Sequence, residues 1–186
     1  PLQVDSDDVF ISCVSDEFEK DGAPFPGLRT QLDHYLRRAN CRMVVQEVFP
    51  QTAVDTVETL DKLIRGRAAV LHLIGAMPGA VANEKAVAAF LKAVPDFLHH
   101  QPELRDALGD FSGITYTQWE AYIALHHEVP LFIYATDAGL TAQADHLKRL
   151  RLARKYPGEK RIKDPADLFG QLIGDMLAEH QVRYIA

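Results

Sequence analysis

The sequence predicts an α/β fold, a flavodoxin-like three-layer sandwich in which a central parallel sheet of four to five strands, in the order 2-1-3-4-5, lies between two layers of helices. Two observations predict it. Short apolar runs rich in β-branched and aromatic residues alternate with segments of helical period, and right-handed crossovers then place helices on both faces of the sheet. The length of 186 residues suits one domain of this class. We therefore expect a single domain over residues 1–186.

Strands are expected at the apolar runs. Residues 9–14, 43–45, 69–74 and 131–134 have the composition of buried strands. Residues 160–163 are a weaker candidate for a fifth strand, because three of these four residues are cationic and only an edge strand tolerates that composition. The sheet therefore has four strands or five.

Helices are expected where apolar residues recur three or four positions apart. The first covers residues 28–39. The second covers residues 57–64, where Asp55 and Glu58 resemble a capping box at its start and Gly66 marks its end. Further helices are expected at residues 81–94, from an N-cap at Thr115 or Thr117 to residue 125, around residues 147–150, and at residues 168–177.

An unusually long connection, residues 76–114, precedes the helix that begins after Thr115. Connections of this length between regular elements are often functional. We expect an insertion that either covers the neighbouring site as a lid or blocks it.

Composition excludes several classes of protein. Hydrophobic residues make up 47% and charged residues 25% of the chain, and no apolar run approaches the ~20 residues that span a membrane. The net charge of −6 gives no general phosphate-binding surface, so we expect neither a membrane nor a nucleic-acid partner. Cys13 and Cys41 fit buried structural cysteines in a reducing cytoplasm. Because the chain begins with Pro1 rather than Met, we expect a processed product or a fragment of a longer protein.

Several kinds of site are not predicted. The chain has no G-x-x-x-x-G-K-[ST] motif, no G-x-G-x-x-G after the first strand and no G-x-S-x-G elbow. The pairs at 99–100 and 126–127 are adjacent histidines, which point apart on a helix, and no cysteine or carboxylate nearby has zinc-ligand spacing. We interpret them as surface or capping residues and expect no metal. The basic run from Lys148 to Arg161 is interpreted as a solvated helix face.

The strongest candidate for chemistry is Glu120. Sheets of this class bind ligands beyond the carboxyl ends of their strands, beside strand one. Glu120 lies near the start of a helix that reaches this edge, one turn from Tyr116 and next to Trp119. The spacing leaves two interpretations open. Glu120 is a functional carboxylate with aromatic rings beside it, or it complements the positive end of the helix dipole while Trp119 packs in the core.

The segment VFISCVSDE at residues 9–17 resembles the first strand and loop of a TIR (Toll/interleukin-1 receptor) domain. The likeness continues at residues 46–50, 69–75, 116–125 and 129–134, which cover QEVFP, AVLHLIG, the helix of Glu120 and VPLFIY. The sequence is most similar to the bacterial TIR-like effector domains at the N-terminus of multidomain defence or signalling proteins, so the resemblance implies an N-terminal fragment of such a protein. This resemblance implies a cytoplasmic protein, a fused sensor or nucleoside-triphosphatase module, and self-association through TIR–TIR contacts.

The resemblance also implies an activity. Active members cleave NAD+ to nicotinamide and ADP-ribose, or a cyclic variant, with one glutamate on the helix after strand three, and Glu120 occupies that position. A single carboxylate suffices because the pyridinium leaves as a neutral molecule, whereas ordinary glycosidases need two carboxylates. NAD+ is then the substrate, and no cofactor is implied. The candidate substrate-binding residues are Phe10, Ser12, Ser15, Asp16, Phe49, Tyr116 and Trp119.

This chain departs from the family pattern at one informative position. Active members commonly carry a Trp four residues before the glutamate, and Tyr116 stands there in this sequence, so stacking on the substrate falls to Tyr116. Two alternatives from other classes stay open. The first is a catalytically inactive TIR-like assembly module, and the second is a domain that binds a nucleotide messenger without turnover.

Overall fold

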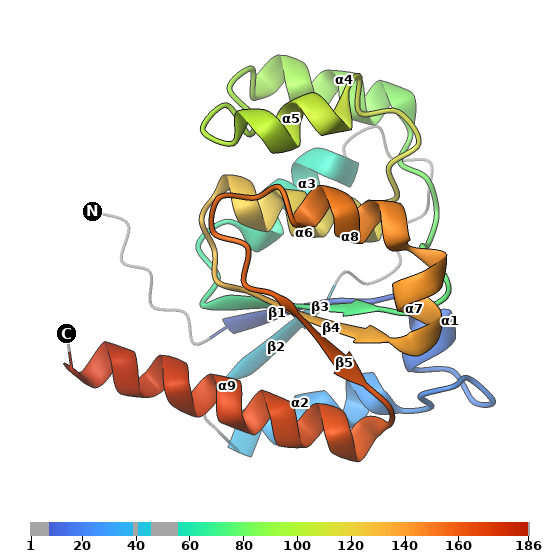
Figure 1. The fold of residues 1–186 in the computed structure, drawn as a ribbon, viewed down its shortest axis with the longest axis vertical. Helices are drawn as coiled ribbons and strands as arrows, with labels where there is room; N and C mark the ends of the chain where they lie inside the picture. Colours follow the sequence, from blue (N-terminus) through green and yellow to red (C-terminus); the bar gives the residue numbers. More distant parts are fainter. Residues whose placement is uncertain (1–7, 39–40, 46–55, 186) are drawn as a thin grey trace.

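A computed structural model of the chain describes residues 8–38, 41–45 and 56–185 (Figure 1). Its strands form one five-stranded parallel sheet in the order β2-β1-β3-β4-β5, which confirms the predicted flavodoxin-like order. The strands are β1 (Asp8–Ser12), β2 (Arg42–Val45), β3 (Ala69–Ile74), β4 (Leu131–Thr136) and β5 (Glu159–Ile162).

Helices cover both faces of the sheet, as right-handed crossovers between parallel strands require (Figure 1). In chain order they are α1 (Ser15–Phe18), α2 (Leu28–Arg38), α3 (Thr56–Ile64), α4 (Glu84–Ala93), α5 (Pro102–Leu108), α6 (Tyr116–His126), α7 (Asp137–Ala142), α8 (Ala144–Leu150) and α9 (Pro165–Ile185). Helices α2 and α9 lie on one face, whereas α3, α6 and α8 lie on the other. Helices α4 and α5 add an outer layer over this second group.

The sheet separates two apolar cores. Strand β1 shows why, because its side chains alternate between the faces with a period of two. Phe10 belongs to the core under α3 and α6, while Val9 and Ile11 belong to the core under α2 and α9. The buried strands therefore read as continuous apolar runs, which is what made them recognisable in the sequence.

The ends of several elements differ from the predicted ones for local reasons. Strand β1 ends at Ser12 rather than at residue 14, because Val14 is already the N-cap of α1. Helix α4 starts at Glu84 rather than at residue 81, because the Asn83 side chain caps it by accepting two backbone N–H groups. Val81 instead forms an antiparallel bridge with Thr115. The predicted cap at Asp55 lies outside the described residues.

The helix that carries Glu120 has a well-defined start. Of the two N-caps predicted for α6, the structure selects Thr115, whose hydroxyl accepts from the backbone N–H of Gln118. The Gln118 side chain accepts in return from the Thr115 backbone N–H, which completes a capping box. Glu120 consequently lies just after the first turn, at a fixed position relative to the sheet.

The long connection of residues 76–114 contributes a layer of structure. It contains α4 and α5, of which α5 was not predicted from the sequence. Three of its phenylalanines pack around one indole from α6, with ring centroids 5.4 to 5.7 Å from that of Trp119. They are Phe90, Phe97 and Phe111. These contacts attach the connection to the outside of α6.

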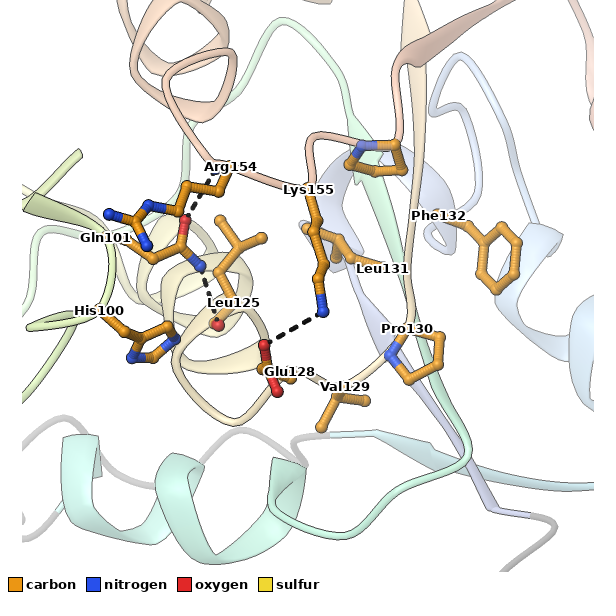
Figure 2. A pocket seen from close by; sticks show the side chains of 11 residues that line it. His100, Gln101, Leu125, Glu128, Val129, Pro130, Leu131, Phe132, Arg154 and Lys155 are labelled. Carbon is orange, nitrogen blue, oxygen red and sulfur yellow. Dashed lines mark hydrogen bonds and ion pairs between the residues drawn. The ribbon is translucent and has the colours of Figure 1, made fainter. Parts of the chain in front are cut away.

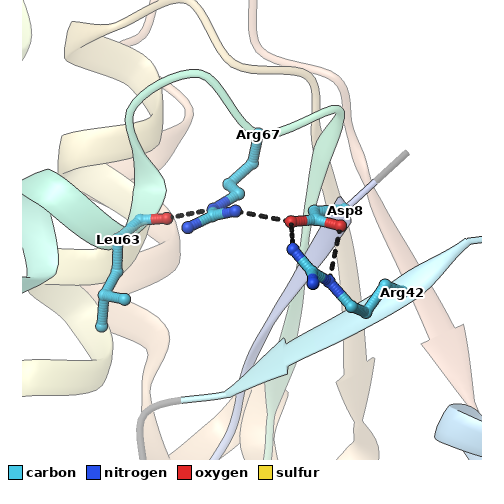
Figure 3. A network of polar contacts seen from close by, with 4 residues as sticks. All are labelled: Asp8, Arg42, Leu63 and Arg67. Carbon is cyan, nitrogen blue, oxygen red and sulfur yellow. Dashed lines mark hydrogen bonds and ion pairs between the residues drawn. The ribbon is translucent and has the colours of Figure 1, made fainter. Parts of the chain in front are cut away.

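The amino-terminal edge of the sheet is held by one buried carboxylate (Figure 3). Asp8 accepts two hydrogen bonds from Arg42 of β2, at 3.0 and 2.6 Å, and one from Arg67, at 2.7 Å. Arg42, followed by Arg67, lowers the pKa of Asp8 below its ordinary value, against the opposing effect of burial. This network joins β1, β2 and the turn before β3 at the edge opposite the carboxyl ends of the strands.

None of the helices within the described ranges is long and apolar enough to cross a membrane.

Candidate active site

A groove of about 660 Å³ opens at the carboxyl ends of β1 and β3, beside the start of α6. This is the edge at which parallel α/β sheets bind ligands, because adjacent crossovers diverge there. Its volume falls within the range of ordinary ligand pockets. Its lining residues are Cys13, Val14, Ser15, Asp16, Lys20, Thr56, Ala76, Met77, Pro78, Gly79, Ala80, Tyr116 and Thr117.

Glu120 lies behind the groove wall and is only 4% exposed. Its Oε2 atom is buried without a hydrogen-bond partner among the described residues. Burial raises the pKa of Glu120 to about 8, and the Ser12 hydroxyl opposes this in part. The Glu120 charge also acts on the neighbouring Cys13 thiol, whose pKa is raised to about 12 mainly by burial. A carboxyl group buried with a free oxygen beside a groove is a strong candidate for function.

Ser12 begins a chain of buried hydrogen bonds on the inner side of Glu120. The Ser12 hydroxyl lies 2.7 Å from His72 Nδ1, and His72 Nε2 lies 2.9 Å from His146 Nε2. His146 Nδ1 lies 2.8 Å from the Tyr122 hydroxyl. Burial lowers the pKa of His72 to about 3 and that of His146 well below its ordinary value, so both imidazoles are neutral. All four side chains are at most 2% exposed.

The contact between His72 and His146 was not predicted from the sequence, although the sequence contained a signal for His72. His72 interrupts the apolar run of β3, and a polar residue inside a fully buried strand must find a partner. Its partner His146 comes from α8, more than seventy residues later, and no local pattern predicts that contact. The pair therefore becomes visible only in three dimensions.

A second buried carboxylate shapes the wall of the groove. Glu17, on α1, accepts the backbone N–H groups of Ala76 and Met77 at 2.8 and 3.0 Å. Its approach requires a glycine at position 75, because a Cβ there would lie 2.1 Å from the Glu17 carboxyl group. The amide of Gln143 donates to the Gly75 carbonyl at 2.8 Å. The turn after β3 is therefore fixed from two sides, and Glu17 has its oxygens occupied.

The structure brings part of the predicted site together. Ser15, Asp16 and Tyr116 line the groove. Ser12 lies behind it with Glu120. The Tyr116 hydroxyl accepts from the backbone N–H of Asn83 at 3.0 Å, which holds the half-buried ring at the groove wall. These residues come from β1, the loop after it, and the first turn of α6.

Two other candidates are placed in the core instead. The Phe10 side chain is completely buried under α3 and α6. Trp119 is also completely buried, because its ring packs within the cluster formed by residues 90, 97 and 111 rather than facing the groove. For Trp119 the structure favours the core interpretation that spacing had left open. Phe49 lies outside the described residues.

A second cavity, of about 450 Å³, lies at the start of β4 and the end of α6 (Figure 2). Apolar side chains such as Leu125 and Leu131 form much of its wall. The Gln101 side chain closes one side by bonding the Leu125 carbonyl and the Arg154 backbone N–H. At the rim Lys155 pairs with Glu128 at 3.3 Å. This cavity contains none of the predicted residues and no buried carboxylate, so the groove beside Glu120 is the stronger site.

Most of the remaining polar side chains have structural partners, whereas His100 Nε2 is buried without a hydrogen-bond partner among the described residues. No group of three or more His, Cys, Asp or Glu side chains within the described ranges is arranged to hold a metal ion. His127 contacts Asp61 at 2.6 Å, and His126 Nδ1 accepts the Leu98 backbone N–H. Most of the basic run pairs with carboxylates, through Arg151 with Glu159, Lys155 with Glu128, Lys160 with Asp175, and Arg161 with Asp137.

Comparison of the chain with protein-family models, with curated proteins and with solved structures gives no match. The choice of a function therefore depends on the geometry around Glu120 and on the sequence resemblance.

Proposed function

We propose that this chain is a TIR-like NAD+ glycohydrolase that cleaves the bond between nicotinamide and ribose, with Glu120 as its catalytic carboxylate. One observation carries the proposal. The Glu120 carboxyl group is buried behind a groove at the carboxyl ends of β1 and β3, and its Oε2 atom has no partner among the described residues. A ribose hydroxyl or a developing positive charge would supply the missing partner.

The reaction needs one anion and no general acid. When the C1′–N bond breaks, its electron pair goes to the pyridinium nitrogen, and nicotinamide leaves as a neutral molecule. The positive charge that remains on the ribose is stabilised by the ionised Glu120, which is most effective where water is excluded. Water then adds to C1′ and loses a proton, giving ADP-ribose, or an internal nucleophile closes a ring.

The same burial imposes two conditions on catalysis. Glu120 must ionise, which a cationic nicotinamide in the groove favours by direct attraction. Substrate must also reach the carboxylate, and at 4% exposure this requires side chains of the groove wall to move aside on binding. Cys13 and Thr117 flank the route, because both line the groove next to the strand and helix that carry Ser12 and Glu120.

Nicotinamide release tests the proposal. Chromatography of reactions with NAD+ at high protein concentration should show nicotinamide from the parent chain and none from the Glu120→Gln variant. The matched control is Glu103→Gln, which changes an exposed carboxylate on α5 and should leave the rate unchanged. NADH should not be cleaved by any of them, because its dihydronicotinamide is not a cationic leaving group.

The alternatives give different results in the same preparation. Binding of NAD+ without nicotinamide release would favour a domain that recognises a nucleotide messenger. Neither binding nor release, together with self-association, would favour an assembly module. Equal release from the parent and from Glu120→Gln would remove Glu120 from the catalytic role.

The proposal includes the setting that the resemblance implies. We propose a cytoplasmic effector in bacterial immunity or signalling, fused to a sensor or nucleoside-triphosphatase module. Contacts between copies of the domain complete the site, as the resemblance implies for TIR-like domains. Light scattering of the chain over a range of concentrations tests this self-association directly, and a monomer at every concentration would contradict it.

A further inference from the structure

Ser12 and His72 have the geometry of a serine nucleophile with its base, but Ser12 is in the wrong place for that role. A hydroxyl 2.7 Å from an imidazole nitrogen that is itself held by a third group resembles a catalytic triad. Ser12, however, is completely buried, so no substrate atom reaches its oxygen. Its hydroxyl instead forms a hydrogen bond with the buried Glu120 carboxyl group and lowers the pKa of that group.

Apart from a longer hydrogen bond of 3.4 Å that the Ser12 hydroxyl donates to the Thr117 carbonyl, counting hydrogens leaves two arrangements in which the bonds form one continuous chain. A neutral imidazole carries one N–H, so it donates through one nitrogen and accepts through the other. His72 and His146 face each other through Nε2, and only one of these two atoms can carry a proton. In the first arrangement every hydrogen bond points from Tyr122 toward Glu120. In the second every hydrogen bond points from Glu120 toward Tyr122.

The charge of Glu120 selects between them. An ionised Glu120 accepts from Ser12, so His72 donates to Ser12 through Nδ1 and the first arrangement is stabilised. A protonated Glu120 donates to Ser12, which then donates to His72 Nδ1 and stabilises the second. The tautomers of both histidines are therefore coupled to the protonation of Glu120, although neither histidine becomes charged.

We propose that the carboxyl proton of Glu120 leaves the site through a relay of four side chains: Ser12, His72, His146 and Tyr122. The Glu120 proton passes to Ser12 Oγ, and the Ser12 proton passes to His72 Nδ1. The His72 Nε2 proton then passes to His146 Nε2, the His146 Nδ1 proton to Tyr122 Oη, and the phenolic proton to solvent. Each relay member ends neutral, Glu120 ends as the anion, and no electrons are transferred.

The relay rests on the proposed function, which explains why such a route is needed. Glu120 must be an anion when the nicotinamide departs, and a dinucleotide in the groove closes the direct path from the carboxyl group to water. The relay leads inward instead, from the carboxyl end of β1 to α8. There Arg149 acts on the Tyr122 hydroxyl and lowers its pKa, against the larger effect of burial. Tyr122 is completely buried and Arg149 beside it is half-buried, so release of the phenolic proton to solvent requires the Arg149 side chain to move aside.

Other ionisable groups around the relay cannot take its place. Arg149, on α8, acts on Tyr122 and His146, and Cys13, the residue after β1, interacts electrostatically with Glu120. The Cys13 thiol is neutral at physiological pH, because its pKa is raised to about 12. Arg149 is a permanent cation and has no free site for a proton.

Nitrogen NMR of the chain labelled with ¹⁵N-histidine tests the relay without any substrate, because protonated and unprotonated ring nitrogens differ widely in chemical shift. At a pH about two units below the Glu120 pKa, His72 should carry its proton on Nε2 and His146 on Nδ1. About two units above it, the positions should be exchanged. The exchange should follow the ionisation of Glu120, measured in parallel by ¹³C NMR of its carboxyl carbon, and should be absent in Glu120→Gln.

A pair of buried tyrosines gives a matched control. In Tyr122→Phe an N–H on His146 Nδ1 would have no acceptor, so both histidines should be locked in the high-pH arrangement at every pH. Tyr134 is equally buried, but it belongs to the core on the other face of the sheet, where its hydroxyl donates to Asp175 at 2.7 Å. Tyr134→Phe should therefore leave the exchange intact.

Three results would overturn the relay. They are fixed tautomers in the parent chain while Glu120 ionises, an imidazolium at His72 or His146 near neutral pH, and an exchange that survives in Glu120→Gln. The readout is independent of turnover. An exchange of tautomers in a chain that releases no nicotinamide would support the relay and contradict the proposed activity, whereas release with fixed tautomers would do the reverse.

Discussion

At the scale of single residues, burial and hydrogen bonding have opposite effects on the pKa of Glu120. Burial favours the neutral acid and raises the pKa to about 8, while the Ser12 hydroxyl favours the anion. The proposed chemistry uses the anion. Nicotinamide release should therefore increase with pH through about 8 and level off above it, measured as kcat/KM in buffers of constant ionic strength.

A rate that is independent of pH between about 6 and 9 would contradict this assignment, because Glu120 would then already be ionised in the free enzyme. A rate that falls across the same interval would require the protonated acid. That outcome would favour a different chemistry at the site.

Ser12→Ala should displace this pH profile rather than abolish activity. Without the hydroxyl, the anion of Glu120 loses a hydrogen bond, so the pKa of the carboxyl group rises further above about 8. A rise of about one unit lowers the rate about tenfold at neutral pH and restores it at high pH. The expected signature in kcat/KM is therefore a parallel displacement toward alkaline pH.

The matched control for Ser12→Ala is Ser112→Ala, because Ser112 is exposed in the connection before α6. Its profile should coincide with that of the parent chain. If Ser12→Ala instead lowers the rate equally at every pH, Ser12 does not act through the ionisation of Glu120.

At the scale of elements, close packing between α7 and the end of β3 supports the floor of the site. Gly139 permits this contact, since a Cβ there would lie 2.2 Å from the backbone oxygen of Ile74. Gly139→Ala should destabilise the chain by roughly 1–3 kcal/mol, because the obstructing atom belongs to the backbone and cannot rotate away. Urea unfolding followed by circular dichroism measures this change.

Gly170→Ala provides the comparison within α9. Gly170 is exposed, and a Cβ there meets nothing within 4 Å. The same substitution should therefore stabilise the chain, by about 0.5–1 kcal/mol, through helix propensity alone. Equal effects at both positions would show that α7 moves away from β3 at little cost.

The elements themselves were largely predictable from the sequence, and their ends were less so. The strand order follows from alternation along the chain, and even the cationic run at β5 occupies the edge position that its composition requires. Helices α1, α5 and α7 were not predicted, because four to seven residues give few positions at which a periodic pattern can show. Helix α4 begins later than expected because the cap at Asn83 overrides the apolar residue at Val81.

The position of a candidate site residue was predictable where it follows from the element that carries the residue. Tyr116 reaches the groove because it opens α6, and Glu120 lies behind the wall because it is one turn further along. Trp119 was harder to place, because three phenylalanines from a distant connection enclose it. His146 contacts His72 across 74 positions of sequence, a distance over which spacing carries no information.

At the scale of the whole molecule, the two faces of the sheet have different interiors. The core under α2 and α9 is almost entirely apolar. The core under α3, α6 and α8 contains the buried acid Glu120 and the neutral pair of His72 and His146. Because these groups have pKa values displaced in opposite directions, the stability of the whole fold should depend on pH on both sides of neutrality.

The sign of each dependence follows from comparing the folded with the unfolded chain. Glu120 has a pKa of about 8 when folded and 4.5 as a model value, so the folded state holds the proton more tightly. The contribution of Glu120 to the free energy of unfolding is therefore fully present below pH 4.5 and is lost as the pH rises through about 8. The pKa of His72 is about 3 in the folded chain and 6.5 as a model value, so the folded state holds this proton less tightly. The contribution of His72 to stability is therefore lost as the pH falls from 6.5 toward 3.

The free energy of unfolding should consequently be highest near about pH 6, where the two intervals overlap and the opposing dependences cancel, and should decline in both directions. Glu120→Gln replaces the buried acid by a neutral side chain of the same shape, so it should remove the alkaline decline, which is on the order of 3–5 kcal/mol at most, and leave the acid decline unchanged. Urea unfolding at a series of pH values measures both, and the single tryptophan, buried Trp119, reports the transition by fluorescence. Glu103→Gln should retain the parent curve. If Glu120→Gln also shows the pH dependence of the parent chain, the carboxyl group of Glu120 is ionised in the folded chain, and a hydrogen-bond partner present in solution compensates its burial.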